Sequence, residues 1–159
     1  MITSVDTNII LDVLIPGEPF SESSKMLLDR HLSKGNLIIC EVVFAELAAG
    51  FPSQEGLKSF LSDTGMKLVC SDEKSLFLAG SRWAEYATKR SKNEFLCGGC
   101  GHAFEVPCPQ CTAKLTKRLH VLADFLIGAH ALMHADCILS RDLGVYRTYF
   151  NDLKVVDSI

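Results

Sequence analysis

Short apolar segments alternate with helical segments along the chain, and this alternation limits the fold more than any other feature of the sequence. The apolar segments expected to form strands are 1–5, 37–39, 67–70, 137–139 and 154–156. The segments expected to form helices are 7–14, 21–33, 41–49, 54–61, 71–90, 122–133 and 145–150. Buried strands that alternate with helices are typical of a parallel sheet covered on both faces. The pattern therefore predicts an α/β three-layer fold with a central, mostly parallel sheet.

Two of the predicted helices carry apolar residues at helical spacing. In segment 71–90 these residues are Leu76, Phe77, Gly80, Trp83, Ala84 and Ala87. In the helix after the cysteines they are Leu122, Phe125, Leu126, Ala129, Leu132 and Met133. An apolar stripe on a helix normally faces the core of the protein. We therefore expect both stripes to be packing surfaces.

Composition and length favour one soluble domain spanning 1–159. The chain has 159 residues, of which 48% are hydrophobic and 22% are charged, and this is enough to bury a core without disulfides. The first apolar segment reaches Asp6 at once, which does not fit a signal peptide. No apolar run reaches the roughly 20 residues needed to span a bilayer. We therefore expect a cytoplasmic protein without a membrane partner.

Four of the seven cysteines form a pattern that is typical of a metal site. Cys97 and Cys100 form one Cys-x-x-Cys pair, and Cys108 and Cys111 form a second. Two such pairs supply the tetrahedral set of four sulfurs that structural zinc prefers. Segment 95–113 is therefore expected to be an inserted four-cysteine zinc knuckle, and a redox motif or a group of free thiols is the alternative. The other cysteines, expected to be small buried apolar residues, are Cys40, Cys70 and Cys137.

His130 and His134 lie four residues apart, as do the histidines of a hydrolytic zinc helix. Such a helix also requires a glutamate directly after its first histidine, and this chain has Ala131 at that position. We interpret the pair as ordinary histidines near the end of a helix.

Four acidic residues are candidates for a functional site, and two of them, Asp6 and Asp142, stand where a parallel sheet would gather a ligand. Asp6 follows the first strand, Asp142 follows the fourth, Glu46 lies in the helix after the second, and Asp124 opens a later helix. Ligands of open α/β sheets bind at the carboxyl ends of the strands. Each acid alone could equally be a helix cap or a turn residue. Thr7, beside Asp6, has a hydroxyl suited to capping the next helix.

The order of these acids and the sequences around them resemble the PIN-domain ribonucleases, and most closely the toxins of the VapC type. The matching segments are Val5–Asp12 (VDTNIILD), Phe44–Leu47 (FAEL), Ala123–Ala131 (ADFLIGAHA), Ala135–Asp142 (ADCILSRD) and Tyr149–Val156 (YFNDLKVV). The resemblance covers nearly the whole chain, and the fold it implies is the PIN-like three-layer fold.

The resemblance implies a metal-dependent endoribonuclease that acts as the toxin of a toxin–antitoxin pair. Mg²⁺ or Mn²⁺ would be held by Asp6, Glu46, Asp124 and Asp142. Asn8 and Ser140 would support these ligands. Several carboxylates in one pocket repel one another, and hard divalent cations relieve that repulsion. The resemblance also implies an RNA substrate, an antitoxin protein as partner and a homodimer.

The cysteine segment departs from the usual toxin pattern and keeps two alternatives open. Some PIN endonucleases that mature ribosomal RNA carry a zinc ribbon, so an RNA-processing enzyme is one alternative. A non-catalytic module that binds RNA or protein through the knuckle is the other. The net charge of −3 does not by itself indicate a nucleic-acid partner. Basic residues follow the cysteines, however, and the candidates for RNA binding are Lys114, Lys117 and Arg118.

Overall fold

The computed structural model describes residues 1–89, 95–96, 103–104, 106–112 and 122–158. Its strands are β1 (Ile2–Val5), β2 (Asn36–Ile39), β3 (Met66–Leu68), β4 (Phe95–Leu96), β5 (Ala103–Phe104), β6 (Cys137–Leu139) and β7 (Val155–Val156). Its helices are α1 (Thr7–Leu14), α2 (Ser21–Leu32), α3 (Glu41–Ala48), α4 (Gln54–Asp63), α5 (Glu73–Lys89), α6 (Leu122–His134) and α7 (Leu143–Tyr149). The expected elements are therefore present, with ends that shift by a few residues.

Five strands form one sheet in the order β3-β2-β1-β6-β7, and every neighbouring pair is parallel. Thr3 of the central strand β1 lies opposite Leu37 of β2 on one side and Cys137 of β6 on the other. The ladder continues past β1, where the Asp6 backbone N–H donates to the Leu139 carbonyl over 3.0 Å. The carboxyl ends of β1 and β6 therefore meet at one edge of the sheet, and Asp6 stands at that edge.

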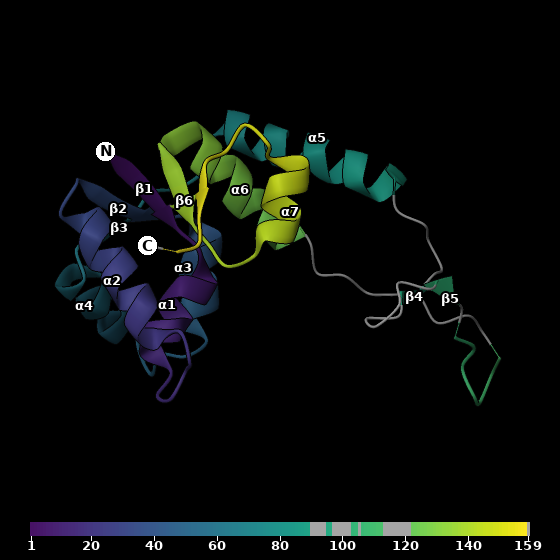
Figure 1. The fold of residues 1–159 in the computed structure, drawn as a ribbon, viewed down its shortest axis with the longest axis horizontal. Coiled ribbons are helices and arrows are strands. Elements are labelled where there is room, and N and C mark those ends of the chain that lie inside the picture. The colour runs from purple at the N-terminus through teal and green to yellow at the C-terminus, as the bar shows by residue number, and fades with distance from the viewer. Residues whose placement is uncertain (90–94, 97–102, 105, 113–121, 159) are drawn as a thin grey trace.

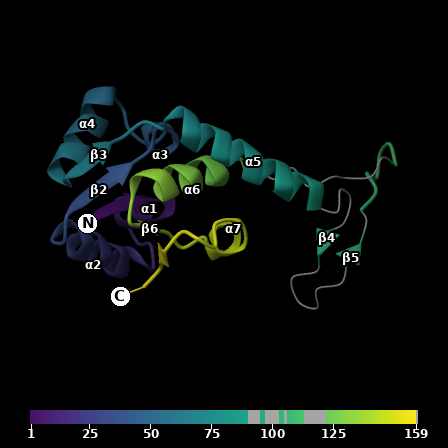
Figure 2. The same ribbon diagram turned by 90° about the horizontal axis from the view of Figure 1, so that it is seen from above.

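Helices cover both faces of this sheet, which confirms the expected α/β layering. Figures 1 and 2 show α2 on one face and the pair α5–α6 on the other. Helices α5 and α6 pack along each other, and the Tyr86 ring lies 5.7 Å from the Phe125 ring. Segment 90–121, which contains the predicted knuckle, joins these two packed helices.

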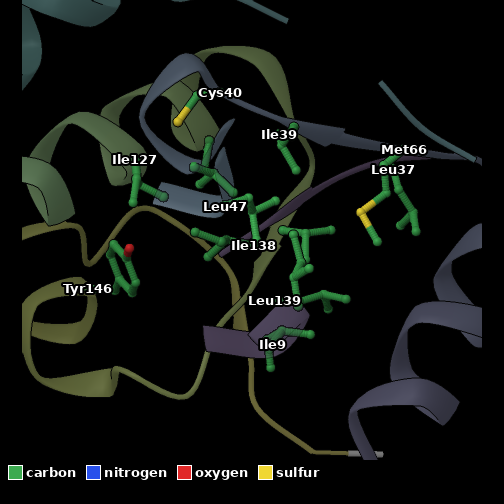
Figure 3. Close-up of a cluster of buried hydrophobic side chains, with 14 of the residues drawn as sticks. Ile9, Leu37, Ile39, Cys40, Leu47, Met66, Ile127, Ile138, Leu139 and Tyr146 are labelled. Carbon is green, nitrogen blue, oxygen red and sulfur yellow. The ribbon is translucent and has the colours of Figure 1, made fainter. Parts of the chain in front are cut away.

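The core lies between the sheet and its helices. Figure 3 shows part of it, with Ile9, Leu47, Ile127, Ile138 and Tyr146 in one cluster, and all five side chains are buried. Ile127 and Tyr146 bring α6 and α7 into this cluster, so packing of the core fixes the two helices that border the edge occupied by Asp6.

Gly128 of α6 lets α7 approach closely. A Cβ atom at this position would lie 2.9 Å from Cε2 of Phe150 and 3.0 Å from Cε1 of Tyr146. Both aromatic rings are fully buried, so neither can move aside into solvent. Only glycine leaves enough room for this contact.

The apolar stripe expected to pack in α5 is on the outside, so that prediction was wrong. Phe77 is 78% exposed, Leu76 is 46% exposed and Trp83 is 42% exposed. The side of α5 that faces the protein instead carries the buried residues Ser75 and Ala79. Leu78 and Tyr86 of α5 also pack against the core, so the inner face of α5 combines small and large side chains.

The prediction for the remaining cysteines is confirmed at two positions of three. Cys40 and Cys137 are buried, whereas Cys70 is exposed. Cys70 lies just beyond β3, the outermost strand at its end of the sheet, so the sheet covers it from one side at most.

A second, two-stranded sheet lies within the predicted insertion. Strands β4 and β5 pair antiparallel, with Phe95 opposite Phe104 and Leu96 opposite Ala103. Among the described residues, no helix is both long and apolar enough to cross a bilayer.

Candidate active site

Asp6 is the centre of a hydrogen-bond network at the carboxyl edge of the sheet. Its side chain is 5% exposed and caps α1, where Oδ1 accepts the Thr7 backbone N–H over 2.7 Å. Oδ2 accepts from Ser140 Oγ over 2.6 Å, from Asn8 Nδ2 over 2.9 Å and from the Tyr146 hydroxyl over 3.3 Å. Burial raises the pKa of Asp6 above its ordinary value, and nearby Glu46 adds to this effect.

Asn8 and Ser140 lie where side chains that support Asp6 would be expected. Asn8 Nδ2 also donates to Ser140 Oγ over 3.2 Å, and Asn8 Oδ1 accepts the Arg141 backbone N–H over 3.1 Å. Ser140 Oγ in turn accepts the Asp142 backbone N–H over 3.0 Å. These bonds tie the first turn of α1 to the loop between β6 and α7.

Glu46 reaches this network through Thr7 rather than through Asp6. The Thr7 hydroxyl donates a hydrogen bond to Oε2 of Glu46, which links α1 to α3. The sequence suggested that this hydroxyl would cap α1, and that interpretation was wrong. Asp6 takes the capping position instead, so the threonine hydroxyl is free to orient the glutamate.

Asp124, in the first turn of α6, lies near enough to the other three acids for their charges to act on it. Burial, followed by the negative charges of Asp142, Asp6 and Glu46 in that order, raises the pKa of Asp124 to about 6. Asp142 caps α7, where Oδ1 accepts the Gly144 backbone N–H over 3.0 Å. The sequence left a helix cap open as an alternative role for Asp142, and the structure shows that Asp142 does cap α7. The charge of the same side chain also raises the pKa of Asp124.

The acids have no positively charged partner within the described part of the chain. No Lys or Arg of those ranges is hydrogen-bonded or ion-paired to Asp6, Glu46, Asp124 or Asp142. Equally, no group of three or more His, Cys, Asp or Glu side chains among the described residues is placed so that it could hold a metal ion. The arrangement is thus a concentration of negative charge in which the carboxylates repel one another.

Two contributors to this site were absent from the sequence interpretation. Tyr146 contributes its hydroxyl to Asp6 from α7, although its ring is part of the core. Arg141, between Ser140 and Asp142, forms an ion pair with Asp12 of α1 at 2.7 Å. The sequence did contain one signal for the ion pair of Arg141. This arginine directly follows a buried strand, and a partly buried arginine requires a counter-charge.

A groove lies beside Glu46 and has a volume of about 390 Å³. Its apolar lining comes from α1, α3 and the segment after α3. The lining residues are Leu11, Leu14, Ile15, Glu46, Leu47, Gly50, Phe51 and Pro52. An apolar groove thus leads to one of the four acids.

Half of the predicted zinc ligands fall within the described residues. Cys108 and Cys111 begin and end a tight turn in which the Thr112 backbone N–H donates to the Cys108 carbonyl over 2.9 Å. Backbone N–H groups of Cys111 and Gln110 lower the pKa of the Cys108 thiol. Cys97 and Cys100 lie outside the described residues, as do the proposed RNA-binding residues Lys114, Lys117 and Arg118.

His130 and His134 stack on each other in α6, with ring centroids 4.8 Å apart. His134 Nε2 lies 3.1 Å from Ser75 Oγ, and Asp72 is 3.8 Å from the same nitrogen. His130 is fully buried, and neither of its ring nitrogens has a hydrogen-bond partner among the described residues. Burial and the neighbouring His134 lower the pKa of His130.

Comparison with known proteins gives structural matches only. No family model and no curated protein matches the sequence. A chain of VapBC2 from Rickettsia felis, solved bound to a DNA fragment from their promoter, matches with a TM-score of 0.63 and 20% identity over 100% of both chains. A chain of VapBC-1 from nontypeable Haemophilus influenzae matches with a TM-score of 0.61 and 19% identity over 99% of this chain and 98% of that one.

A chain of FitAB, solved bound to an IR36 DNA fragment, matches with a TM-score of 0.59 and 18% identity over 98% of this chain and 94% of that one. These likenesses show that the fold is shared from end to end with chains of VapBC and FitAB complexes. The five-stranded parallel sheet flanked by helices is consistent with the PIN-like fold expected from the sequence.

Proposed function

We propose that this protein is a metal-dependent endoribonuclease that hydrolyses RNA phosphodiester bonds. The observation that carries the proposal is the effect of Asp142, Asp6 and Glu46 on Asp124. Four acids from distant parts of the sequence act on one point at the carboxyl edge of a parallel sheet, where α/β proteins bind their ligands. The fold shared with chains of VapBC and FitAB complexes supports the same assignment.

The chemistry of the four acids, rather than their spacing in this structure, suits a hard divalent cation, Mg²⁺ or Mn²⁺. Carboxylate oxygens are the ligands such ions take. After burial, repulsion by the other acids is the second cause of the raised pKa of Asp124, and a cation would relieve that repulsion. We propose that Asp6, Glu46, Asp124 and Asp142 hold the ion. When bound, such an ion lowers the pKa of water and stabilises charge on a phosphodiester under attack.

The rest of the network holds the carboxylates in place. Ser140, Asn8 and Tyr146 all donate to Oδ2 of Asp6, so the orientation of that buried carboxylate is set before any ligand arrives. Thr7 does the same for Glu46. Positioning groups that are already in place need not reorganise during the reaction, which is the physical basis of preorganised catalysis.

Cleavage of labelled structured RNA in Mg²⁺ or Mn²⁺ tests this proposal. We expect the native chain to cleave and Asp6→Asn to lose at least a hundredfold in rate, because the amide keeps the shape but removes the charge. Asp63→Asn, at an exposed position at the end of α4, is the matched control and should cleave normally. Equal rates for native protein and Asp6→Asn would rule out the acidic site as the catalyst.

We propose a structural zinc ion held by Cys97, Cys100, Cys108 and Cys111. The turn that brings Cys108 and Cys111 together, with backbone N–H groups directed at the Cys108 thiol, supports the second Cys-x-x-Cys pair of this ligand set. Mass spectrometry under native conditions should find one zinc per chain, and Cys108→Ser should lose it. Retention of zinc by this variant would exclude Cys108 as a ligand.

The same proposal extends to RNA contacts in the basic segment after the knuckle. Replacement of Lys114, Lys117 and Arg118 by alanine should weaken RNA binding and reduce the slope of log affinity against log salt by roughly two, since each phosphate contact on single-stranded RNA contributes about 0.7. An unchanged slope would show that these residues do not contact phosphate.

We also propose an antitoxin partner and a homodimer, as the resemblance implies. The similar chains were solved as parts of VapBC and FitAB complexes, and the apolar groove could hold a segment of such a partner beside Glu46. Purification of this chain together with the product of an adjacent small gene, followed by inhibition of RNA cleavage, tests the antitoxin. Cleavage that such a product does not inhibit favours an RNA-processing enzyme.

A further inference from the structure

Three exposed cations lie at the amino edge of the parallel sheet, opposite the edge that carries the acids. Lys34 lies two residues before β2, Lys154 lies directly before β7, and Arg30 lies in the last turn of α2. The Lys154 carbonyl accepts the Ile138 backbone N–H over 2.9 Å, which fixes Lys154 beside β6. Because all five strands run in the same direction, the loops that carry these lysines meet at one edge.

His31, at the end of α2, shows how close these cations are to one another. Its side chain is 7% exposed, and its Nδ1 lies 3.0 Å from Thr3 Oγ1 of β1. Burial lowers the pKa of this imidazole, and the charges of Lys34, Arg30 and Lys154 lower it further. Positive charges from three separate segments therefore act on one point at the amino edge.

These cations have no anionic partner within the described part of the chain. None of the three side chains makes a hydrogen bond or an ion pair there. Asp136, an acid at the same edge, already accepts the Ile2 backbone N–H over 2.7 Å. Like charges that are held close together repel one another, and a bound anion would relieve that repulsion.

We propose that Arg30, Lys34 and Lys154 bind phosphates of an RNA strand, at a surface separate from the acids. The inference rests on the proposed function, which supplies RNA as the ligand. An acidic cleavage site repels the phosphates that flank the cleaved bond, so affinity for RNA must come from cations elsewhere on the protein. Contacts of this kind position the RNA without reading its sequence.

The distance between the two edges allows one RNA molecule to reach both. Strand β1 has four residues, which corresponds to about 13 Å from edge to edge. One strand of a nucleic-acid duplex carries a phosphate about every 3.4 Å, so about four phosphates separate the edges. Helix α2 covers the face of the sheet opposite α5 and α6 (Figures 1 and 2), which puts this surface on the α2 side of the protein.

Binding of labelled structured RNA tests the proposal. Asp6→Asn is the background, so that the RNA stays intact and affinity is measured whether or not the native chain cleaves. Adding Lys34→Ala and Lys154→Ala should weaken binding at least fivefold. The slope of log affinity against log salt should fall by about 1.4 to 1.8, since each phosphate contact contributes about 0.7 on a single strand and about 0.9 on a duplex. Arg30 is kept, because a cation in the last turn also stabilises α2.

A matched pair of lysines controls for net charge. Lys58 of α4 and Lys74 of α5 are exposed, and their replacement by alanine removes the same two charges. This control pair should bind RNA as the background does, and all variants should keep the same thermal midpoint by circular dichroism. The imidazole resonances of His31 should shift as RNA is added and should shift much less in the variant without Lys34 and Lys154.

Each outcome separates this surface from the proposed nuclease activity. No binding of RNA, no loss of affinity without Lys34 and Lys154, or an equal loss in the control pair overturns the inference. RNA binding that requires these two lysines, in a protein whose native chain cleaves no RNA, would instead retain the surface and remove the proposed nuclease function.

Discussion

Arg141 Nε donates a hydrogen bond to Oδ2 of Asp12 over 2.7 Å and joins α1 to the loop that carries two site residues. The same guanidinium donates to Ser23 and Ser24 of α2, over 2.9 Å and 2.7 Å. Its backbone N–H bonds to Asn8. One arginine therefore fixes both N-terminal helices relative to the loop that holds Ser140 and Asp142.

We expect Arg141→Lys to lower the free energy of unfolding by about 1–3 kcal/mol, because lysine cannot reproduce the planar set of donors that serves Asp12, Ser23, Ser24 and the Asp157 carbonyl. Urea unfolding followed by tryptophan fluorescence or circular dichroism measures the change. Arg147→Lys is the control, since Arg147 is 66% exposed and its nearest ion-pair contact, to Asp157, is 3.9 Å. Equal losses for the two variants would show that the Arg141 network adds no stability.

The raised pKa of Asp124 predicts a pH-dependent stability for the protein without divalent cation. A carboxyl whose pKa rises from 3.8 to about 6 on folding binds more protons in the folded state. Stability is therefore lost as the pH rises from about 4 to about 6. Because Asp124 is half-buried, solvent screening reduces the effect to about 1 kcal/mol. Asp124→Asn should be more stable than the native chain by that amount at pH 7 and no more stable at pH 4.

Thermal unfolding at both pH values, without added Mg²⁺ or Mn²⁺, makes this comparison. Asp63→Asn serves again as the control, because Asp63 is exposed and remote from the acids. A constant difference between native protein and Asp124→Asn across this range would refute the assigned cause.

Binding of a divalent cation should depend on pH for the same reason. Below about pH 6 the cation competes with a proton on Asp124, so affinity should be about tenfold weaker at pH 5 than at pH 7. Calorimetric titration with Mn²⁺ measures both the affinity and the protons released. Asp124→Asn should bind more weakly at pH 7 and respond less to pH. A native affinity that is independent of pH would mean that Asp124 is not a ligand.

The lowered pKa of His130 predicts that the stability of the protein falls as the pH falls below neutrality. A buried histidine whose pKa is lowered on folding contributes stability that is complete above about pH 6.5. That contribution is lost as the pH falls, by at most about 1.4 kcal/mol per pH unit. His130→Leu should therefore lose less stability than the native chain between pH 7 and pH 5. Parallel unfolding curves for the two proteins would assign the acid sensitivity to other groups.

The sequence was sufficient to predict the layers of the fold, because the spacing of its apolar residues distinguishes strands from helices and because glycine and proline residues separate them. Gly17 and Gly65, for example, adopt positive φ angles at turns where the pattern predicts an end. The positions of Asp6 and Asp142 after parallel strands followed from the same alternation. The convergence of acids could be anticipated because parallel strands bring their carboxyl ends to one edge.

Orientation within α5 could not be predicted from hydrophobicity. Phe77 and Ala79 both fit a helix. Which of the two faces inward depends on the packing of α5 against α6, which is a property of the two helices together. Tyr146 illustrates the same limit. A buried tyrosine signals that its hydroxyl has a partner, but only the packing of α7 against α6 identifies that partner as Asp6.

The close packing of Tyr86 against Phe125 also bears on how such a chain can evolve. Helices α5 and α6 pack against each other through their own contacts, so their arrangement does not depend on the segment that connects them. Segments of different length or chemistry can be gained, lost or exchanged between residues 89 and 122 without repacking the sheet or moving the acids. A cysteine-bearing segment at this position is therefore separable from the rest of the fold, and a chain without it should keep the same sheet and the same α5–α6 packing.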